Sequence, residues 1–129
     1  MRLTFLGSGD AFGSGGRFHT CILVETSETR FLVDCGGSAI AAIQQRGIDT
    51  AGLDMMFLTH LHGDHIGGLP YVLLDAHFVR RRTAPLLVAG PPGTSERLVT
   101  MMDVLYPGAW AAGFRFPVDI TELAAQAPG

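Results

Sequence analysis

One short segment, Thr59 to His65 (THLHGDH), gathers three of the chain's five histidines and one carboxylate within six residues. Imidazole nitrogens and carboxylate oxygens are typical ligands of Zn²⁺ and related divalent ions. Residues two apart in an extended chain point to the same side, so His60 and His62 can reach one ion. Gly63 permits a sharp turn, after which Asp64 and His65 face elsewhere. We therefore expect two ions, each bound by two of these groups and each lacking further ligands.

The alternative interpretation of this segment is a solvated surface cluster of histidines. The apolar run Met55–Leu58 leads directly into the cluster, which indicates a loop at the end of a buried strand. Loops of this kind, placed by a rigid scaffold, are where functional residues concentrate. The metal interpretation is therefore favoured.

The elements expected around this segment alternate between strands and helices, which favours a mixed α/β layered fold. A four-residue turn separates the two strands of a predicted hairpin, and Ser38 and Gly47 are suited to cap the first helix. The predicted strands are Leu3–Leu6, Cys21–Glu25, Arg30–Asp34, Asp54–Thr59, Leu86–Ala89 and Phe114–Ile120. The predicted helices are Ser38–Arg46, His65–Arg80 with Pro70 near its start, and one capped by Thr94 or Ser95.

Composition limits the remaining possibilities. The chain has 129 residues, of which 47% are apolar and 16% charged, and its formal net charge is −3. The apolar and charged fractions exclude a disordered acidic or basic tail. The net charge also excludes the strongly basic surface that is typical of nucleic-acid-binding proteins. All nine basic residues are Arg, so a Schiff-base lysine and a Walker-type phosphate loop are excluded. No apolar run reaches the 18 or so residues of a membrane span, and no signal peptide is recognisable, so we expect a cytoplasmic protein.

Several other residues have less specific interpretations. Cys21 and Cys35 lie in apolar runs and are expected to be buried thiols in a reducing compartment, with a disulfide or a metal thiolate as the alternative. His19 follows a glycine-rich loop and is interpreted as a surface or supporting residue, or as a substrate contact. Arg80–Arg82 is expected to be a solvated helix end rather than a phosphate contact. Asp75 is expected on a solvated face.

Several motifs of the chain resemble those of one family, the metallo-β-lactamase-fold hydrolases. The segment HLHGDH resembles its His-x-His-x-Asp-His motif, and Asp34-Cys35-Gly36 resembles its first motif. Leu6-Gly7-Ser8-Gly9 with Gly15-Gly16-Arg17, the segment THLHGDHIGGLP, and Gly90-Pro91-Pro92-Gly93 resemble the ribonuclease Z-like branch. The resemblance covers essentially the whole chain.

This resemblance implies an αββα sandwich with metals between its two halves, and it assigns ligands. His60 and His62 would hold the first metal, Asp64 and His65 the second, and Asp34 would support the metal loop from behind. Family members complete the site with a third His, a bridging Asp and a final His downstream, but this sequence has no histidine after His77. Residues 1–129 are therefore expected to be the N-terminal half of such a domain, an α/β (α+β) unit with a mixed sheet and helices on one face. With the C-terminal half absent, we expect weak metal binding and little turnover.

The activity implied is hydrolysis by water activated between two divalent ions, most simply Zn²⁺, with Mn or Fe as alternatives. Asp64 is the candidate to orient the nucleophile or take its proton. The substrate would be a phosphodiester, small or RNA, or an ester. Asp34-Cys35-Gly36-Gly37-Ser38 lacks the Glu and Gln of tRNA-processing members, and the acidic balance also disfavours RNA. The alternative function is a non-catalytic metal-binding or interaction module. Expected partners are a second copy or a C-terminal half, and no membrane.

Overall fold

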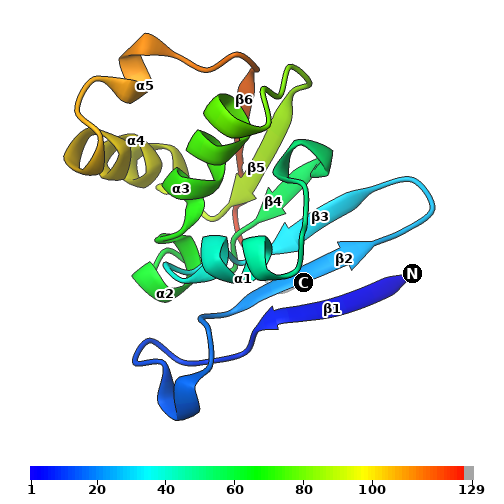
Figure 1. Ribbon diagram of the computed structural model, residues 1–129. Coiled ribbons are helices and arrows are strands. Elements are labelled where there is room, and N and C mark those ends of the chain that lie inside the picture. The colour runs from blue at the N-terminus through cyan, green and yellow to red at the C-terminus, as the bar shows by residue number, and fades with distance from the viewer. Residues whose placement is uncertain (127–129) are drawn as a thin grey trace.

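A six-stranded mixed sheet forms the framework, and its strands follow chain order from β1 to β6 (Figure 1). The structure is a computed structural model and describes residues 1–126. β1–β2 and β2–β3 pair antiparallel, whereas β3–β4, β4–β5 and β5–β6 pair parallel. The strands are β1 (Arg2–Gly7), β2 (Cys21–Glu25), β3 (Arg30–Val33), β4 (Met55–Phe57), β5 (Leu86–Gly90) and β6 (Val118–Glu122). The predicted hairpin and α/β class are confirmed.

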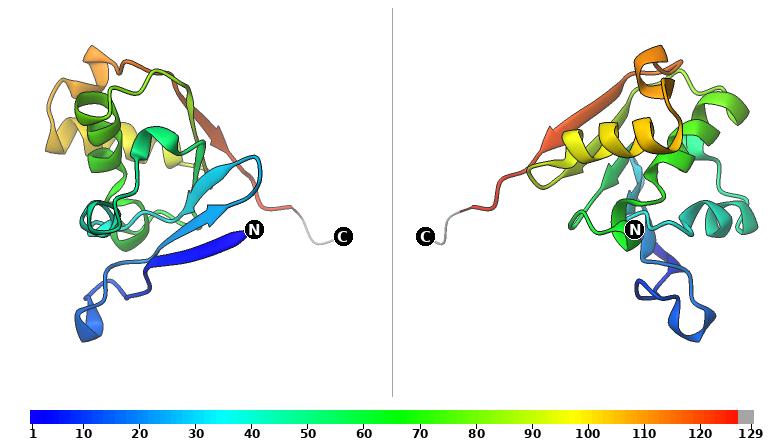
Figure 2. Two further views of the ribbon diagram at one scale, coloured as in Figure 1. Left: turned by 45° about the vertical axis from the view of Figure 1, so that its right-hand side comes forward. Right: turned by 90° about the vertical axis from the view of Figure 1, so that its left-hand side faces the viewer.

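Helices cover one face of this sheet (Figure 2). The α-helices are α1 (Ala39–Gln45), α2 (Gly63–Ile66), α3 (Leu69–Leu74), α4 (Thr94–Leu105) and α5 (Ala109–Ala112). Two 3₁₀ turns, η1 (Ser14–Gly16) and η2 (Thr50–Gly52), and a π-helical turn, η3 (Asp75–Val79), complete the set. None of the helices in residues 1–126 is long and apolar enough to cross a membrane.

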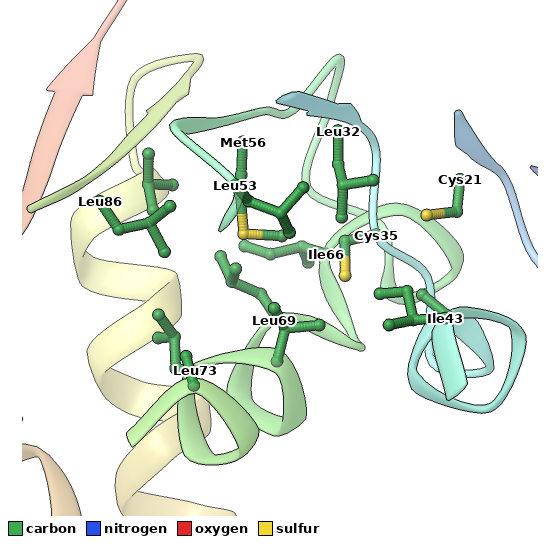
Figure 3. Close-up of a cluster of buried hydrophobic side chains, with 14 of the residues drawn as sticks. Cys21, Leu32, Cys35, Ile43, Leu53, Met56, Ile66, Leu69, Leu73 and Leu86 are labelled. Atoms are coloured by element: carbon green, nitrogen blue, oxygen red, sulfur yellow. The ribbon is translucent and has the colours of Figure 1, made fainter. Parts of the chain in front are cut away.

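The core lies between the sheet and these helices (Figure 3). Leu32, Met56 and Val88 pair in register across β3, β4 and β5, and all three are buried on this face. Cys21 and Cys35 belong to the same core as free thiols, which confirms their predicted burial and not the disulfide alternative. Burial raises the pKa of the Cys21 thiol to about 12.

The opposite face of the sheet carries apolar side chains that no helix covers. Leu3 and Phe5 of β1 are 52% and 60% exposed. Two registered rows cross β1 to β5 on this face, and every residue in them is apolar, whereas β6 continues the rows with Asp119 and Thr121. The apolar rows are Leu3, Val24, Phe31, Met55 and Leu87, and Phe5, Ile22, Val33, Phe57 and Ala89. We call these ten residues the open sheet face.

The prediction of a single helix over His65–Arg80 is wrong, because the chain there forms three helical segments, α2, α3 and η3. α2 begins at Gly63, two residues earlier than predicted, and ends before Gly67. At Gly68 the backbone packs directly against the loop after β3: an added Cβ would lie 2.0 Å from the Gly36 carbonyl oxygen. This contact requires a bend between α2 and α3, and the last turn is π-helical.

The cap of α4 and the last strand also differ from the predictions. Gly93, with φ of 95°, is the N-cap residue of α4, rather than Thr94 or Ser95. The backbone N–H groups of Gly93 and Ser95 both donate to Oε1 of Glu122, at 3.1 and 3.0 Å, so a carboxylate from β6 caps this helix. The last strand covers 118–122 instead of 114–120, and the short helix α5 was not predicted.

Arg82 is buried and Asp75 is partly buried, contrary to the solvated positions predicted for them. Arg82 is 4% exposed, and its guanidinium donates to five backbone carbonyls, those of Thr50, Ala51, Leu53, Ala84 and Pro85. Asp75 accepts hydrogen bonds from Thr50 Oγ1 and Gln44 Nε2. Both side chains supply hydrogen-bond partners to polar groups at places where irregular backbone meets the core. The spacing of apolar residues in the sequence does not predict this role.

Candidate metal centre

The histidine-rich segment leaves the carboxyl end of β4 and turns immediately into α2. His62 is the N-cap residue of α2, and its carbonyl accepts the N–H groups of His65 and Ile66. Asp64 and His65 therefore lie in the first turn of a helix, rather than before it. His62 is extended, with φ of −68° and ψ of 151°, and His60 lies in the loop between β4 and α2, because β4 ends at Phe57 and not at Thr59 as predicted.

Asp34 lies behind this segment and connects its two halves. It follows β3 in a left-handed backbone conformation, with φ of 60°, and is 2% exposed. Its Oδ1 accepts the backbone N–H of Thr59 at 2.8 Å. Its Oδ2 accepts the Thr59 hydroxyl at 2.8 Å and contacts His65 Nδ1 at 2.8 Å. One buried carboxylate thus fixes both the start of the loop and the helix that follows.

These contacts decide which ring nitrogens carry hydrogen. A carboxylate only accepts, so the hydrogen of His65 lies on Nδ1, which leaves Nε2 with a free lone pair. Thr59 Oγ1 donates to Asp34, and His60 Nδ1, 3.1 Å away, can then donate to Thr59. Asp34 therefore presents the Nε2 lone pairs of His65 and, through Thr59, of His60. Carboxylate-oriented imidazoles of this kind are a common feature of metal ligands.

The spacing of one pair of donor atoms suits a divalent ion. Asp64 Oδ2 and His65 Nε2 are 3.2 Å apart. Two atoms bound to one tetrahedral zinc at about 2.0–2.1 Å lie roughly 3.3 Å apart. The rings of His60 and His62 are nearly perpendicular, with centroids 4.9 Å apart. No three His, Cys, Asp or Glu side chains within residues 1–126 are grouped to hold one ion. The described residues thus offer pairs of donors and no complete ligand set.

Close packing between glycines fixes the two loops against each other. An added Cβ at Gly36 would lie 2.3 Å from the Asp64 carbonyl oxygen. Cys35 N–H donates to the His65 carbonyl, and Gly68 N–H donates to the Cys35 carbonyl, at 2.7 and 2.9 Å. Only glycine at positions 36 and 68 allows this approach of the two backbones. The position of α2 is therefore set by packing as well as by Asp34.

His19 lies beside the same loop. Its backbone N–H donates to Ser38 Oγ at 2.7 Å, which explains why this hydroxyl makes no capping bond to α1 although Ser38 is the N-cap residue. The His77 ring, by contrast, lies far along the chain in η3, where its Nδ1 accepts the backbone N–H of Arg115. The two histidines outside the motif thus lie in different environments: His19 lies beside the histidine-rich loop, and His77 lies in η3.

Two further residues at the site were not singled out from the sequence. Thr59 links Asp34 to His60, and its place directly before the first histidine is the signal that could have identified it. Arg97 of α4 donates from Nη1 to the Leu61 carbonyl at 2.9 Å, and no sequence pattern indicates this contact. A hollow of about 340 Å³ also opens beside Thr59. Leu58, Thr59, Gly90, Pro91, Pro92, Leu123, Ala124 and Ala125 line it.

The mixed sheet, its one-sided helical layer and the histidine-rich segment define a ribonuclease Z-like protein of the metallo-β-lactamase fold. The model of one family, described as Anti-Pycsar protein Apyc1, matches residues 1–97. The chain belongs to this family.

Three known proteins illustrate the similarity. Ribonuclease Z of Methanococcus maripaludis (strain C6) is 34% identical over 128 residues, which are 99% of this chain and 40% of that protein. Ribonuclease Z of Methanothermobacter thermautotrophicus is 39% identical over 106 residues, 82% of this chain and 34% of the relative. The crystal structure of human tRNase Z, short form, aligns with a TM-score of 0.81 and 27% identity, covering 98% of this chain and 46% of that one. The chain thus spans about two fifths of the length of the curated relatives it matches.

Proposed function

We propose that the whole protein is a divalent-metal-dependent hydrolase that cleaves phosphodiester bonds. The support comes from two directions. The curated relatives are named ribonuclease Z, a name that denotes cleavage of RNA phosphodiesters. In this chain, one buried carboxylate, Asp34, orients His65 directly and His60 through Thr59 at the end of β4. This orientation of two imidazoles is the observation that carries the proposal, because it has a clear use in holding metal ions.

His60 and His62 are the proposed ligands of one ion, and Asp64 and His65 those of a second. Divalent ions bound there supply Lewis acidity toward a phosphoryl oxygen and a nucleophile derived from water at neutral pH. Zinc suits this mixed imidazole and carboxylate set, and manganese or iron are the alternatives that elemental analysis distinguishes. Asp64 has a second carboxylate oxygen besides the one near His65, and this oxygen can orient the nucleophile or accept its proton.

The completing ligands are proposed to come from a C-terminal half that covers the open sheet face. Ten apolar residues in two rows on one face of a sheet are typical of a surface that packs against a second layer. The relatives' greater length supports the same inference. Residues 1–129 alone are then expected to bind metal weakly and to turn over little, since catalytic zinc usually has three protein ligands.

The substrate class within this proposal is a phosphodiester, either in RNA or in a small molecule, and the protein is expected in the cytoplasm. The hollow beside Thr59 is lined largely by apolar groups and could take the part of the substrate next to the scissile bond. Hydrolysis rates measured with an activated small diester and with a short oligoribonucleotide distinguish a small-molecule substrate from RNA.

The test uses the whole protein, purified with its metal. Elemental analysis should approach two ions per chain, and bis(p-nitrophenyl) phosphate should be hydrolysed. His62→Ala should lower both metal content and rate, whereas His77→Ala, in η3, should change neither. A metal-free preparation, or equal rates for His62→Ala and wild type, would contradict the proposal. Metal bound with no hydrolysis of any diester would favour the non-catalytic metal-binding module.

A separate experiment tests the C-terminal half. In the whole protein, Phe5→Glu should lower the free energy of unfolding by about 2 kcal/mol or more, because a charge would replace a buried aromatic ring. Val104→Glu is the matched control, since Val104 is 72% exposed on the helical side. Equal stabilities of the two variants would show that solvent, and no second layer, faces β1.

A further inference from the structure

His19, interpreted from the sequence as a supporting residue or a substrate contact, has an unusual ring environment. Its Nδ1 is buried and has no hydrogen-bond partner among residues 1–126. Its Nε2 has no hydrogen-bond partner among these residues either, but this atom is not fully buried. Buried polar atoms are paired in most native proteins, so an exception at a candidate site calls for a functional explanation.

The backbone holds this ring firmly in place. An added Cβ at Gly7 would lie 1.9 Å from the His19 carbonyl oxygen, and Gly9 N–H donates to the Phe18 carbonyl at 2.7 Å. The two glycines therefore bring the start of the loop against the residues just before β2, and Ser38 Oγ holds the His19 amide. The backbone that carries the ring is thus positioned before any ligand arrives, which reduces the entropy cost of binding.

His19 is also close to the proposed metal helix. An added Cβ at Gly36 would lie 2.2 Å from His19 Cβ and 2.3 Å from the Asp64 carbonyl oxygen. The two atoms are therefore separated by no more than the sum of these distances. Figure 1 shows the loop between β1 and β2 at the same end of the sheet as α2. The exposed ring nitrogen thus belongs to the end of the sheet where the reaction would occur.

The buried nitrogen indicates which tautomer is present. A buried N–H without an acceptor is rarer and more costly than an unpaired acceptor lone pair. The neutral ring therefore carries its hydrogen on the exposed Nε2, which makes this atom a donor. Hydrogen bonds from such a donor to an anionic oxygen are stronger than those between neutral groups.

We propose that His19 Nε2–H donates a hydrogen bond to a non-bridging oxygen of the reacting phosphoryl group. The inference rests on the proposed function, since it names a contact in the same site. His19 is here a substrate-binding residue that takes no part in holding metal. Loss of the contact should weaken binding of the substrate, of its phosphomonoester product and of inorganic phosphate alike.

The experiment measures inorganic phosphate binding by calorimetry in the metal-loaded whole protein. His19→Phe keeps the ring volume without a donor, and His19→Gln restores an N–H near the position of Nε2. We expect phosphate Kd to rise about tenfold or more in His19→Phe. It should recover at least partly in His19→Gln and stay unchanged in His77→Phe. Metal content and melting temperature should match wild type in all variants.

Steady-state kinetics provide the second readout. The KM for bis(p-nitrophenyl) phosphate and for a short oligoribonucleotide should rise in His19→Phe with kcat nearly unchanged, as expected for lost ground-state and transition-state binding alike. Equal phosphate Kd in His19→Phe and wild type overturns the inference while leaving the proposed function intact. So does a KM increase confined to the oligoribonucleotide, which would place the contact on a neighbouring phosphate. A wild type that binds no phosphate overturns the inference whatever the activity assay shows.

Discussion

Replacing Asp34 by Asn tests the central argument about the metal loop. Asn has nearly the same shape as Asp and is one of the few residues that tolerate the left-handed backbone found at this position, where φ is 60°. The variant keeps one carbonyl oxygen to accept the Thr59 N–H. Its amide group then faces Thr59 Oγ1 and His65 Nδ1, where the wild type has Oδ2.

This exchange affects stability and metal binding by different routes. Two hydrogen bonds to a charged acceptor are lost, each worth about 1.5–3 kcal/mol, so the free energy of unfolding should fall by about 2–4 kcal/mol after partial compensation. The Asn amide also donates toward His65 Nδ1, which favours the tautomer with hydrogen on Nε2. That nitrogen can then no longer bind a metal. Changes to such supporting groups typically weaken metal affinity by roughly 10–100-fold.

The assay combines urea unfolding of the metal-free whole protein with zinc competition against a chelating dye. Asp103→Asn is the control, because Asp103 lies exposed on α4, on the helical side of the sheet. We expect Asp34→Asn to lose both stability and zinc affinity, and Asp103→Asn to lose neither. Zinc affinity within about twofold of wild type, together with reduced stability, would refute the link between Asp34 and the His65 tautomer.

Three further predictions concern the packing around the site. Gly36→Ala should destabilise the protein by about 1–3 kcal/mol in urea titrations, because the added methyl group would overlap backbone atoms. Gly37→Ala is the control and should be tolerated, because its methyl group would meet only the His19 ring, at 3.6 Å. Equal stabilities would contradict the close packing. Arg82→Met should cost about 3 kcal/mol or more in thermal unfolding, since five buried or partly buried carbonyls lose their donor. A melting temperature equal to that of wild type would exclude this role. The Cys21 thiol should resist DTNB until the protein unfolds. The pKa of this thiol in the folded protein is about 12, above the ordinary value of 9.0. The stabilisation that comes from the neutral buried thiol is therefore full below pH 9 and is lost as the pH rises from 9 towards 12. Urea titrations across that range would detect this loss. Rapid labelling of the native protein would be inconsistent with burial.

Local patterns were sufficient to predict much of the framework. The hairpin from Cys21 to Val33, the helix between Ser38 and Gly47 and the strand before the histidines each have short-range signals: alternating apolar residues, a cap and a turn. The α/β class with helices on one face follows from their order and is confirmed. These features depend on neighbours in sequence, so sequence alone carries them.

The errors arise where distant segments meet. The interruption at Gly68 depends on contact with Gly36, and the burial of Arg82 depends on carbonyls some thirty residues away. The same limit applies to the site. The histidine motif is visible in the sequence, but the contacts from Asp34 to Thr59 and His65 join β3 to the loop after β4, and only the fold brings them together. The ligand roles of the four motif residues stay predictions.

Helix α4 is attached at its first turns to two different parts of the molecule. Glu122, the last residue of β6, accepts the N–H groups of Gly93 and Ser95, and Arg97 one turn later holds the carbonyl of Leu61 between the two proposed ligands of the first ion. A shift of the chain beyond β6 would therefore move α4 and, with it, the backbone between these histidines. The end of β6 and the backbone between His60 and His62 are in this way connected through a single helix.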